Sequence, residues 1–362
     1  MDPFFIVLGR LFLGIIHSKL KRSYSFTVLL ILSILTFGIG FGLSKFLPEE
    51  KLSITNSPKH ESQQFTTLIN PILPFVAQTG LDFGELRSFR PKIEALIAKS
   101  KAEHPELQVS YYYRDLNNGL WTGINEKETF SPASLFKLPL LIAFLKKAET
   151  QPEILKYGFT YHAKDFENVE EEAGFKKEEG KYYTTEDMLQ QMIEYSDNSA
   201  SLVLLNYIGD SAILAVIRDM NIAIGSGYNE KTNFVTVKAY ASIFRVLYNC
   251  SYLNKEMSEK ALSLMSHARY QKGIRGAIPP QIAMAHKYGK RDELTPGSTL
   301  KTLQLHHFAL VYHPQKPFLL GIMTKGTNLA LKEKLIHDLA ALTYEEVDKQ
   351  CKEKKLRGVF SE

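Results

Sequence analysis

The sequence has few cysteines and lacks the common metal-binding patterns. Its 362 residues include only two cysteines, Cys250 and Cys351. They could form one bond, but two cysteines do not make a disulfide framework. No C-x-x-C, H-x-H-x-D or H-E-x-x-H pattern occurs, so we predict neither a metal site nor another cofactor. His306 and His307 lie in an alternating apolar run, and we expect them on opposite faces of a strand.

The sequence also lacks a strong charge bias and any internal repeat. The formal net charge is +5, and lysines and acidic residues are interspersed after residue 85. This distribution offers no basic face, so we predict no nucleic-acid partner. Hydrophobic residues make up 44% of the chain and charged residues 23%. That balance is typical of a globular protein with a substantial core and excludes a disordered chain.

Charge is wholly absent from residues 26–43. At about 1.5 Å per residue this stretch spans roughly 27 Å, enough to cross the hydrocarbon core of a bilayer. Basic residues precede it, which predicts a cytoplasmic N-terminus and an exported body. No clear small-x-small cleavage site follows, so we expect an uncleaved anchor. We therefore predict a cytoplasmic basic segment (1–22), a single-pass anchor in the cell membrane (23–46) and a linker (47–84).

Hydrophobic periodicity predicts one domain over residues 85–350 and a C-terminal tail over 351–362. A helix over 86–104 precedes a hairpin, whose strands at 107–114 and 120–124 flank a turn. Further helices are predicted over 138–147, 188–195, 200–208, 212–220, 237–248 and 255–267, with a solvated charged loop over 167–181. Strands at 281–286, 307–312 and 317–323 and a helix over 329–342 complete the domain.

This order of elements predicts an α/β protein of the α+β type. The two N-terminal strands and the three C-terminal strands are expected to form one five-stranded antiparallel sheet flanked by helices. The helical middle of the chain would form a second, all-helical lobe. An N-terminal transmembrane helix would precede this domain.

Ser134 and Lys137 form the first candidate for catalysis. Residues three apart lie on one face of a helix, and a serine hydroxyl becomes a good nucleophile when a neighbouring base takes its proton. A lysine amine acts as that base when burial lowers its pKa. The same S-x-x-K spacing begins at Ser18 and at Ser298. Only Ser134 begins a long apolar helix that could bury its lysine.

Two further groups of polar residues follow. Ser196 and Asn198 lie at the end of a predicted helix, where a second hydroxyl can relay a proton to a leaving amine and an amide can hydrogen-bond a substrate. We expect Asp197, between them, to hold the loop and not to react. At the end of a predicted strand, Lys287 offers a positive charge for a carboxylate, and Gly289 lets a substrate approach the backbone.

In this order and spacing, the three groups resemble the S-x-x-K, S-D-N and K-T-G set of class A β-lactamases and penicillin-binding proteins. The resemblance extends over residues 85–342. It implies the two-lobed β-lactamase-like fold of a serine β-lactamase or DD-peptidase, with the site between the lobes. It also implies an oxyanion hole formed by the backbone N–H groups of Ser134 and Lys290.

The resemblance implies roles for the side chains as well. Ser134 resembles the acylated nucleophile, and Lys137 resembles the lysine that activates it. Ser196 matches the proton-relaying serine, and Asn198 matches the contact to the substrate amide. Lys287 matches the lysine that helps this serine and draws in the substrate carboxylate.

Two features depart from the family's pattern. Tyr288 stands where the family usually has a threonine or serine that binds the substrate carboxylate, so it would face away or bind a different substrate group. The E-x-x-L-N loop, whose glutamate activates the deacylating water, is missing. Glu230 is the only acid between residues 221 and 236 and is the remaining candidate, although an exposed loop glutamate is the commoner alternative. Without a replacement base the acyl-enzyme should persist.

We therefore expect a membrane-anchored, extracytoplasmic serine hydrolase. It would open an amide of a small-molecule β-lactam or of a peptidoglycan stem peptide through acyl-Ser134. One alternative is a penicillin-binding DD-carboxypeptidase or transpeptidase acting on D-Ala-D-Ala stems, favoured by the missing loop glutamate and the predicted tether. Another is a non-catalytic sensor or scaffold on a degenerate hydrolase fold, for which Tyr288 is the main support.

Overall fold

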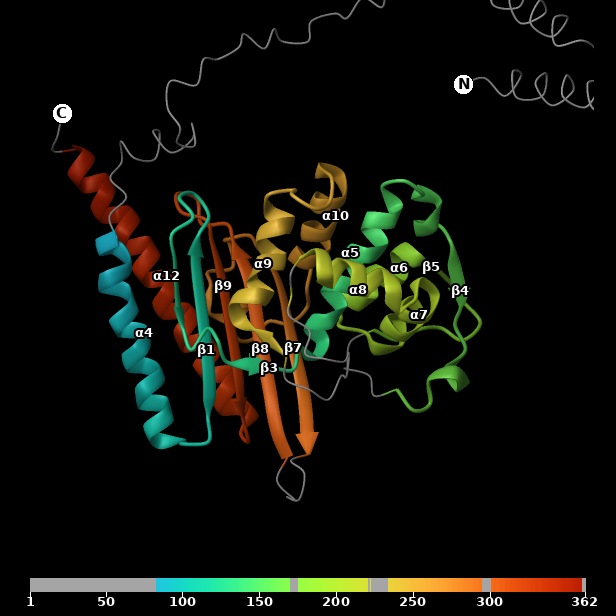
Figure 1. Ribbon diagram of the computed structural model, residues 1–362, viewed down its shortest axis with the longest axis horizontal. Coiled ribbons are helices and arrows are strands. Elements are labelled where there is room, and N and C mark those ends of the chain that lie inside the picture. The colour runs from blue at the N-terminus through green and yellow to red at the C-terminus, as the bar shows by residue number, and fades with distance from the viewer. Residues whose placement is uncertain (1–82, 170–174, 221, 223–233, 295–300, 360–362) are drawn as a thin grey trace, which may run out of the picture. The chain divides into compact units, whose positions relative to one another are not determined.

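The computed structural model describes residues 83–169, 175–220, 222, 234–294 and 301–359 of the chain. Its centre is a five-stranded antiparallel sheet in the order β2-β1-β9-β8-β7 (Figure 1). The strands are β1 (Gln108–Asp115), β2 (Trp121–Ile124), β7 (Met284–Leu294), β8 (Lys301–Val311) and β9 (Phe318–Gly326). The N-terminal hairpin and the C-terminal meander therefore form one sheet, which confirms the predicted architecture.

One face of the sheet is covered by α4 (Phe83–Glu103) and α12 (Leu329–Val359), with the short α11 (Ile274–Ala277) beside α12. Their apolar side chains pack with those of the sheet into one buried cluster. The Tyr111 hydroxyl of β1 shares a hydrogen bond of 2.8 Å with Thr343 Oγ1 of α12. The two ends of the described chain thus meet on the same side of the sheet.

The other face of the sheet packs against the helical part of the molecule. Its helices are α5 (Lys137–Ala148), α6 (Thr185–Glu194), α7 (Asn198–Ile208), α8 (Asp210–Asp219), α9 (Val237–Tyr248) and α10 (Lys255–Ser266). The rings of Tyr240 and Phe244 of α9 lie against Phe308 of β8. Residues 137–145 of α5 are all buried, as expected of a helix that is apolar on every side.

Polar residues begin several of these helices. Thr184 and Asp187 form a capping box at α6, in which each side chain accepts the backbone N–H of the other residue. Thr236 accepts the N–H of Ala239 at the start of α9. These contacts satisfy N–H groups that have no acceptor within the helix.

Short strands and turns connect the larger elements. β3 (Thr129–Phe130) pairs with β6 (Val235–Thr236), and β4 (Gly158–Thr160) pairs with β5 (Tyr182–Thr184). Three 3₁₀ turns are η1 (Ala133–Phe136), η2 (Pro152–Leu155) and η3 (Ala163–Phe166). The β3–β6 pair joins the segment before Ser134 to the segment before α9.

Three elements are clearly longer than predicted: β8 begins at Lys301 instead of residue 307, and β7 and α12 extend past their predicted ends. β7 continues to Leu294 instead of ending at residue 286, because polar side chains are tolerated on the outer strand of a sheet. α12 continues to Val359 instead of ending at residue 342. Val347 is buried against the sheet-side cluster, and Lys352 pairs with Asp348 one turn earlier. Residues 351–359, predicted as part of a tail, therefore belong to this helix.

The predicted anchor (23–46) and all but the last two residues of the predicted linker (47–84) lie outside the described residues. Within the described part, no single helix has the length and apolar character to cross a membrane. The pair α7 and α8 meets those criteria jointly, but its two helices are bent by 92°. No disulfide joins Cys250 and Cys351.

Candidate active site

Ser134 lies on η1, and Lys137 is the first residue of α5, which continues from it. Ala133 has a positive φ of 51°, a sparsely populated conformation that turns the chain sharply into η1. Ser134, which was expected to begin the apolar helix, thus lies in a 3₁₀ turn that leads into it, and the α-helix itself begins at Lys137. Side chains three apart eclipse one another in a 3₁₀ turn, so Ser134 and Lys137 still share one face, and both line the same pocket.

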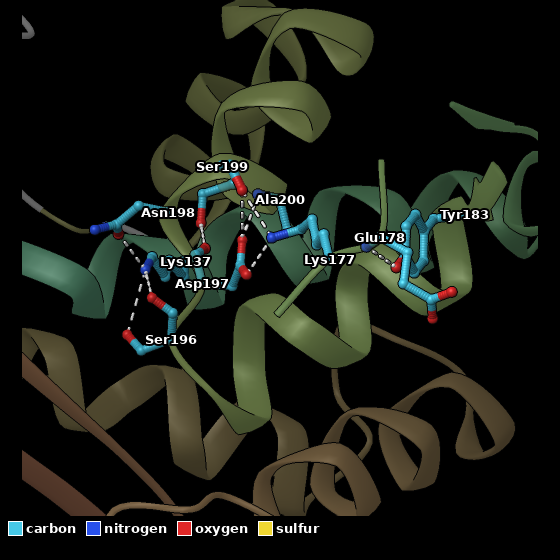
Figure 2. Close-up of polar contacts among 10 residues, drawn as sticks. Lys137, Lys177, Glu178, Tyr183, Ser196, Asp197, Asn198, Ser199 and Ala200 are labelled. Carbon is cyan, nitrogen blue, oxygen red and sulfur yellow. Dashed lines mark hydrogen bonds and ion pairs between the residues drawn. The ribbon is translucent and has the colours of Figure 1, made fainter. Parts of the chain in front are cut away.

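The Lys137 side chain is buried and reaches the start of α7 (Figure 2). Its Nζ donates to the backbone oxygen of Ser196 and to Asn198 Oδ1, the latter at 2.6 Å. The same Nζ lies 3.3 Å from Ser196 Oγ. Ser196 has a φ of 61°, which is strained for a residue with a side chain. The strained residue thus directs both its carbonyl and its hydroxyl at Lys137.

The Ser196 hydroxyl lies between two lysines from different parts of the fold. Lys287 of β7 donates to Ser196 Oγ at 3.0 Å, opposite the Lys137 amine of α5. Ser196 is 0% exposed and Lys287 1% exposed. A hydroxyl can accept one hydrogen bond while donating another, so this buried serine is placed to pass a proton between its neighbours.

A pocket of about 330 Å³ opens in front of these groups, within the size range of small-molecule sites. Its polar side carries Ser134, Lys137, Asn198, Lys290 and Arg291. The lining also contains the apolar side chains of Phe136, Leu140, Leu202, Leu205 and Phe234. Among the described residues that line it, none is an aspartate or glutamate. No carboxylate base for a water molecule therefore lines this part of the pocket.

Gly289 lets η1 press against the outer edge of β7. A Cβ atom at this position would lie 3.0 Å from both Leu135 N and Pro132 O. We predicted that this glycine admits the substrate to the backbone, but in the structure it admits the segment that carries Ser134. β7 is the outer strand of the sheet, so alternate N–H groups on its free edge have no partner within the sheet. Lys290 lies on this edge and lines the pocket with Ser134.

Tyr288 does not line the described pocket. Its ring stacks on Tyr270 with a centroid separation of 3.9 Å and packs with the cluster under α12. Lys287 Nζ lies 4.8 Å from the centre of the Tyr288 ring, close enough for a cation–π interaction. Of the two alternatives considered for Tyr288, the structure has the one in which it faces away from the pocket.

Three side chains hold the backbone just before Ser134. The Ser131 N–H donates to Gln304 Oε1 at 3.0 Å, and His306 Nε2 donates to Ser131 O at 2.9 Å. Arg291 donates to the Ser131 hydroxyl at 3.2 Å. The segment that leads to Ser134 is thus attached to both β7 and β8 by polar contacts that the sequence patterns did not reveal.

The buried histidines are neutral parts of the framework. The Thr324 N–H donates to His306 Nδ1, so the ring proton lies on Nε2, and burial lowers the pKa of His306 to about 4. His307 points to the opposite face, as predicted, and its Nδ1 accepts the Ile274 N–H. Within the described residues, no cluster of three or more His, Cys, Asp and Glu side chains is placed to hold a metal ion.

Lys177 is a site-supporting residue that sequence reasoning missed. The loop at 167–181 was predicted to be solvated, but the Lys177 side chain is only 3% exposed and pairs with the equally buried Asp197 (Figure 2). It also donates to Ser199 Oγ at 2.7 Å. Asp197 accepts the Ala200 N–H at 2.6 Å and so holds the loop, as predicted. The charged residues of the loop did not indicate that Lys177 would pair with Asp197, because the two residues are 20 positions apart in the sequence.

The structure thus brings most of the predicted residues together. Ser134, Lys137, Ser196, Asn198 and Lys287 meet around one pocket and one hydroxyl, and Lys290 borders them. Tyr288 and Gly289 contribute to packing beside the pocket. Glu230 lies outside the described residues, so its candidacy as a deacylation acid stays a prediction.

Comparisons with known proteins agree with this geometry. A model of the β-lactamase enzyme family matches residues 88–347. Similar solved structures include PBP-A, with 18% identity, 71% of this chain and 96% of that chain covered, and a TM-score of 0.60. A β-lactamase from Chitinophaga pinensis DSM 2588 has 20% identity and a TM-score of 0.62, with 72% of this chain and 99% of that chain covered. A search of curated proteins found no match.

Another similar structure is a point mutant of PBP-A, solved as an acyl-enzyme complex with penicillin G. It has 18% identity and a TM-score of 0.60, over 72% of this chain and 97% of that chain. At these identities the structural likeness establishes the fold alone.

Proposed function

Because the chain belongs to the β-lactamase enzyme family, we propose that it is a serine hydrolase that opens a β-lactam or a related cell-wall amide through acyl-Ser134. The observation that carries this proposal is the position of Ser196 Oγ, 3.3 Å from Lys137 Nζ and 3.0 Å from Lys287 Nζ. These groups adjoin the pocket that contains Ser134. A buried route for a proton therefore lies beside the nucleophile.

Acylation begins when Ser134 Oγ attacks the amide carbonyl and loses its proton to the Lys137 amine. The carbonyls of Ser196 and Asn198 accept both N–H bonds of a neutral amine, which leaves its lone pair for that proton. As the C–N bond breaks, the proton passes through the Ser196 hydroxyl to the departing nitrogen. The product is an ester on Ser134 and a free amine.

The negative oxygen formed during attack requires donors in fixed positions. The backbone N–H groups of Ser134 and Lys290 are assigned to this role, because both residues border the pocket where η1 meets the free edge of β7. A donor of this kind is worth about 3–4 kcal/mol in comparable sites. Lys287, beside Ser196, supplies positive charge for a substrate carboxylate.

Release of the acyl group is the slower half of the proposed cycle. Leu140, Leu202 and Leu205 contribute hydrocarbon to the described wall of the pocket, and hydrocarbon neither positions nor deprotonates a water molecule. This wall favours a second candidate function, that of a DD-peptidase or transpeptidase that β-lactams trap as a persistent ester. Glu230, the only acid between residues 221 and 236, is the candidate acid for faster release.

One experiment separates these candidates. The full-length protein, in neutral detergent, is mixed with a chromogenic cephalosporin and separately with a labelled penicillin. Steady turnover supports β-lactam hydrolysis, whereas a stoichiometric burst with a lasting adduct supports the peptidase candidate. If the wild type is labelled no more than Ser134→Ala, both enzymatic candidates fail and a non-catalytic sensor or scaffold is left.

We also propose that residues 23–46 anchor the protein in the cell membrane, with the catalytic domain extracytoplasmic. The support is the absence of charge in residues 26–43 and the basic residues before them. In intact cells the protein should resist carbonate extraction, and added protease should cleave the catalytic domain from outside. Release of the full-length protein into the soluble fraction would refute the anchor.

A further inference from the structure

A second pocket, of about 550 Å³, lies between the β1–β2 hairpin and α9. It is separate from the candidate active site: Thr236 of β6 lines it, whereas Phe234, two residues earlier, lines the pocket with Ser134. One side of α9, from Lys238 to Arg245, supplies about half of the residues that line it, and Tyr112 and Arg114 of β1 also contribute. None of the catalytic groups discussed above belongs to its described lining.

The lining of this pocket is strongly basic. Arg114, Lys127, Lys238 and Arg245 contribute four cations, and Glu126 contributes the only acid among the described lining residues. Within the described part of the chain, none of these four cations forms an ion pair with a carboxylate. Surface lysines elsewhere do, for example Lys146 with Glu149, Lys181 with Glu178 and Lys334 with Asp338. Like charges gathered around one cavity repel one another unless an anion lies between them.

The sole tryptophan of the chain, Trp121, reports on this pocket. It lies opposite Arg114 in the β1–β2 register and stacks on Tyr112, which lines the pocket, with ring centroids 5.7 Å apart. Lys238 Nζ lies 3.9 Å from the centre of the indole ring. An exposed ring in contact with a lysine holds that cation at the pocket by a cation–π interaction.

We propose that this pocket binds a phosphate ester or pyrophosphate group. A phosphate group presents several strong acceptor oxygens and close to two negative charges at neutral pH, so one group can contact several cations at once. The guanidinium groups of Arg114 and Arg245 can each bind two phosphate oxygens in parallel. A carboxylate carries one charge and two oxygens, and would leave most of these donors unused. The exposed face of Trp121, 39% accessible, is available to a non-phosphate part of the ligand.

Trp121 fluorescence provides the test. Pyrophosphate is titrated into the full-length protein in neutral detergent at low ionic strength, and binding is followed by Trp121 emission and by the melting temperature. We expect a saturable change in emission as Lys238 turns towards the anion, and a rise in melting temperature because the ligand binds the folded state. The double variant Arg114→Gln/Arg245→Gln should bind roughly a hundredfold more weakly, since it loses two charged hydrogen-bonding groups.

A matched control removes the same charge elsewhere. Lys99→Gln/Lys101→Gln changes two exposed lysines of α4 and should bind pyrophosphate like the wild type. Circular dichroism verifies the fold of both variants, and both should react with labelled penicillin at the wild-type rate, so this result is independent of the proposed catalysis. If both double variants lost the same amount of binding, the loss would be due to net charge alone, and the proposed site would be refuted.

Ligand competition identifies the source of the phosphate. Displacement of pyrophosphate by glycerol 3-phosphate indicates a soluble ester, and displacement by short-chain phosphatidylglycerol in the same detergent indicates a lipid headgroup. Succinate should compete far more weakly than either. Competition by succinate equal to that by phosphate esters, or no saturable change in either emission or melting temperature up to about 10 mM pyrophosphate, would overturn the proposal.

Discussion

Lys137 is the residue on which the candidate chemistry depends most directly. Its Nζ joins the start of α5 to the strained turn at Ser196 and to the amide of Asn198. A lysine that serves only as a surface charge would not be 6% exposed and surrounded by acceptors. Its surroundings therefore match the use of its amine as a base.

Lys137→Ala should reduce the rate of acylation by labelled penicillin roughly a thousandfold, because the Ser134 hydroxyl loses its proton acceptor. The fold should persist, since α5 is held by apolar packing along its whole length. Lys147→Ala, on the exposed side of the same helix, is the control and should be acylated normally. Unchanged acylation of the Lys137 variant would refute its assignment as the base.

Gly289 is the second residue with a specific prediction. In Gly289→Ala the new methyl group would lie 2.9 Å from Leu135 Cγ and 3.0 Å from Leu135 N and Pro132 O, so the η1 segment that carries Ser134 must give by a few tenths of an ångström. Because a displacement of about 1 Å in a reacting group costs on the order of a hundredfold in rate, this smaller shift should slow acylation roughly three- to tenfold. The measurement is the acylation rate of folded protein, compared at equal active concentration.

Gly326→Ala provides the control for this substitution on the same sheet. Its methyl group would lie 3.5 Å from Leu107 Cδ1, which is an ordinary contact. This variant should keep the wild-type acylation rate. Similar losses in both alanine variants would mean that the sheet tolerates no added methyl group, and not that Gly289 positions Ser134.

At the scale of elements, the start of α7 depends on a contact with a distant loop. Lys177 and Asp197 are each 3% exposed, and Asp197 also caps α7 through the Ala200 N–H. Ser196 and Asn198 flank this aspartate. The loop before β5 therefore determines where the Ser196 hydroxyl and the Asn198 amide lie, the groups proposed to relay a proton and to bind the substrate.

Lys177→Met should lower the free energy of unfolding by about 3–5 kcal/mol, because it leaves the Asp197 charge buried without its partner. Asp197→Asn keeps an oxygen that can cap α7, but it leaves the buried Lys177 charge without its carboxylate partner. The double variant should lose less than the sum of the two single losses, as measured by urea unfolding. Additive losses would show that the two charges do not interact. Lys181→Met is the control: it removes a lysine from an exposed ion pair and should change the free energy of unfolding little.

At the scale of the whole molecule, the two layers of the fold enclose neutral histidines within the core. His286, His306 and His307 are at most 1% exposed. Burial lowers the pKa of His286 to about 3 and that of His306 to about 4, and holds the pKa of His307 well below its usual value. Their rings accept backbone or histidine N–H groups that a protonated imidazole could not accept.

The free energy of unfolding should therefore fall as the pH falls from about 6.5 towards 4. In this range the unfolded histidines bind protons near their ordinary pKa of about 6.5, while the folded ones do not, so protons favour the unfolded state. Urea unfolding between about pH 7 and pH 4.5 measures the slope. His306→Gln should reduce it by up to about 1.4 kcal/mol per pH unit, whereas a variant of the exposed His267 should not.

The sequence by itself determined the main helices, the membership of the sheet and the three groups of candidate residues. These features depend on hydrophobic periodicity, helix caps and motif spacing, all of which can be read from residues that are close together in the sequence. Ser134 was separable from Ser18 and Ser298 because only its helix is apolar throughout. The polar second half of β7 escaped prediction, since its strand character comes from pairing with β8 and not from its own side chains.

Only the tertiary structure decided which distant groups meet. Lys287 reaches Ser196 from 91 residues away, and Lys177 reaches Asp197 across a loop. Gly289 makes room for η1, and Tyr288 turns to Tyr270. Each of these roles depends on burial and on contacts between segments far apart in the chain, and such contacts leave no pattern in the sequence near either partner.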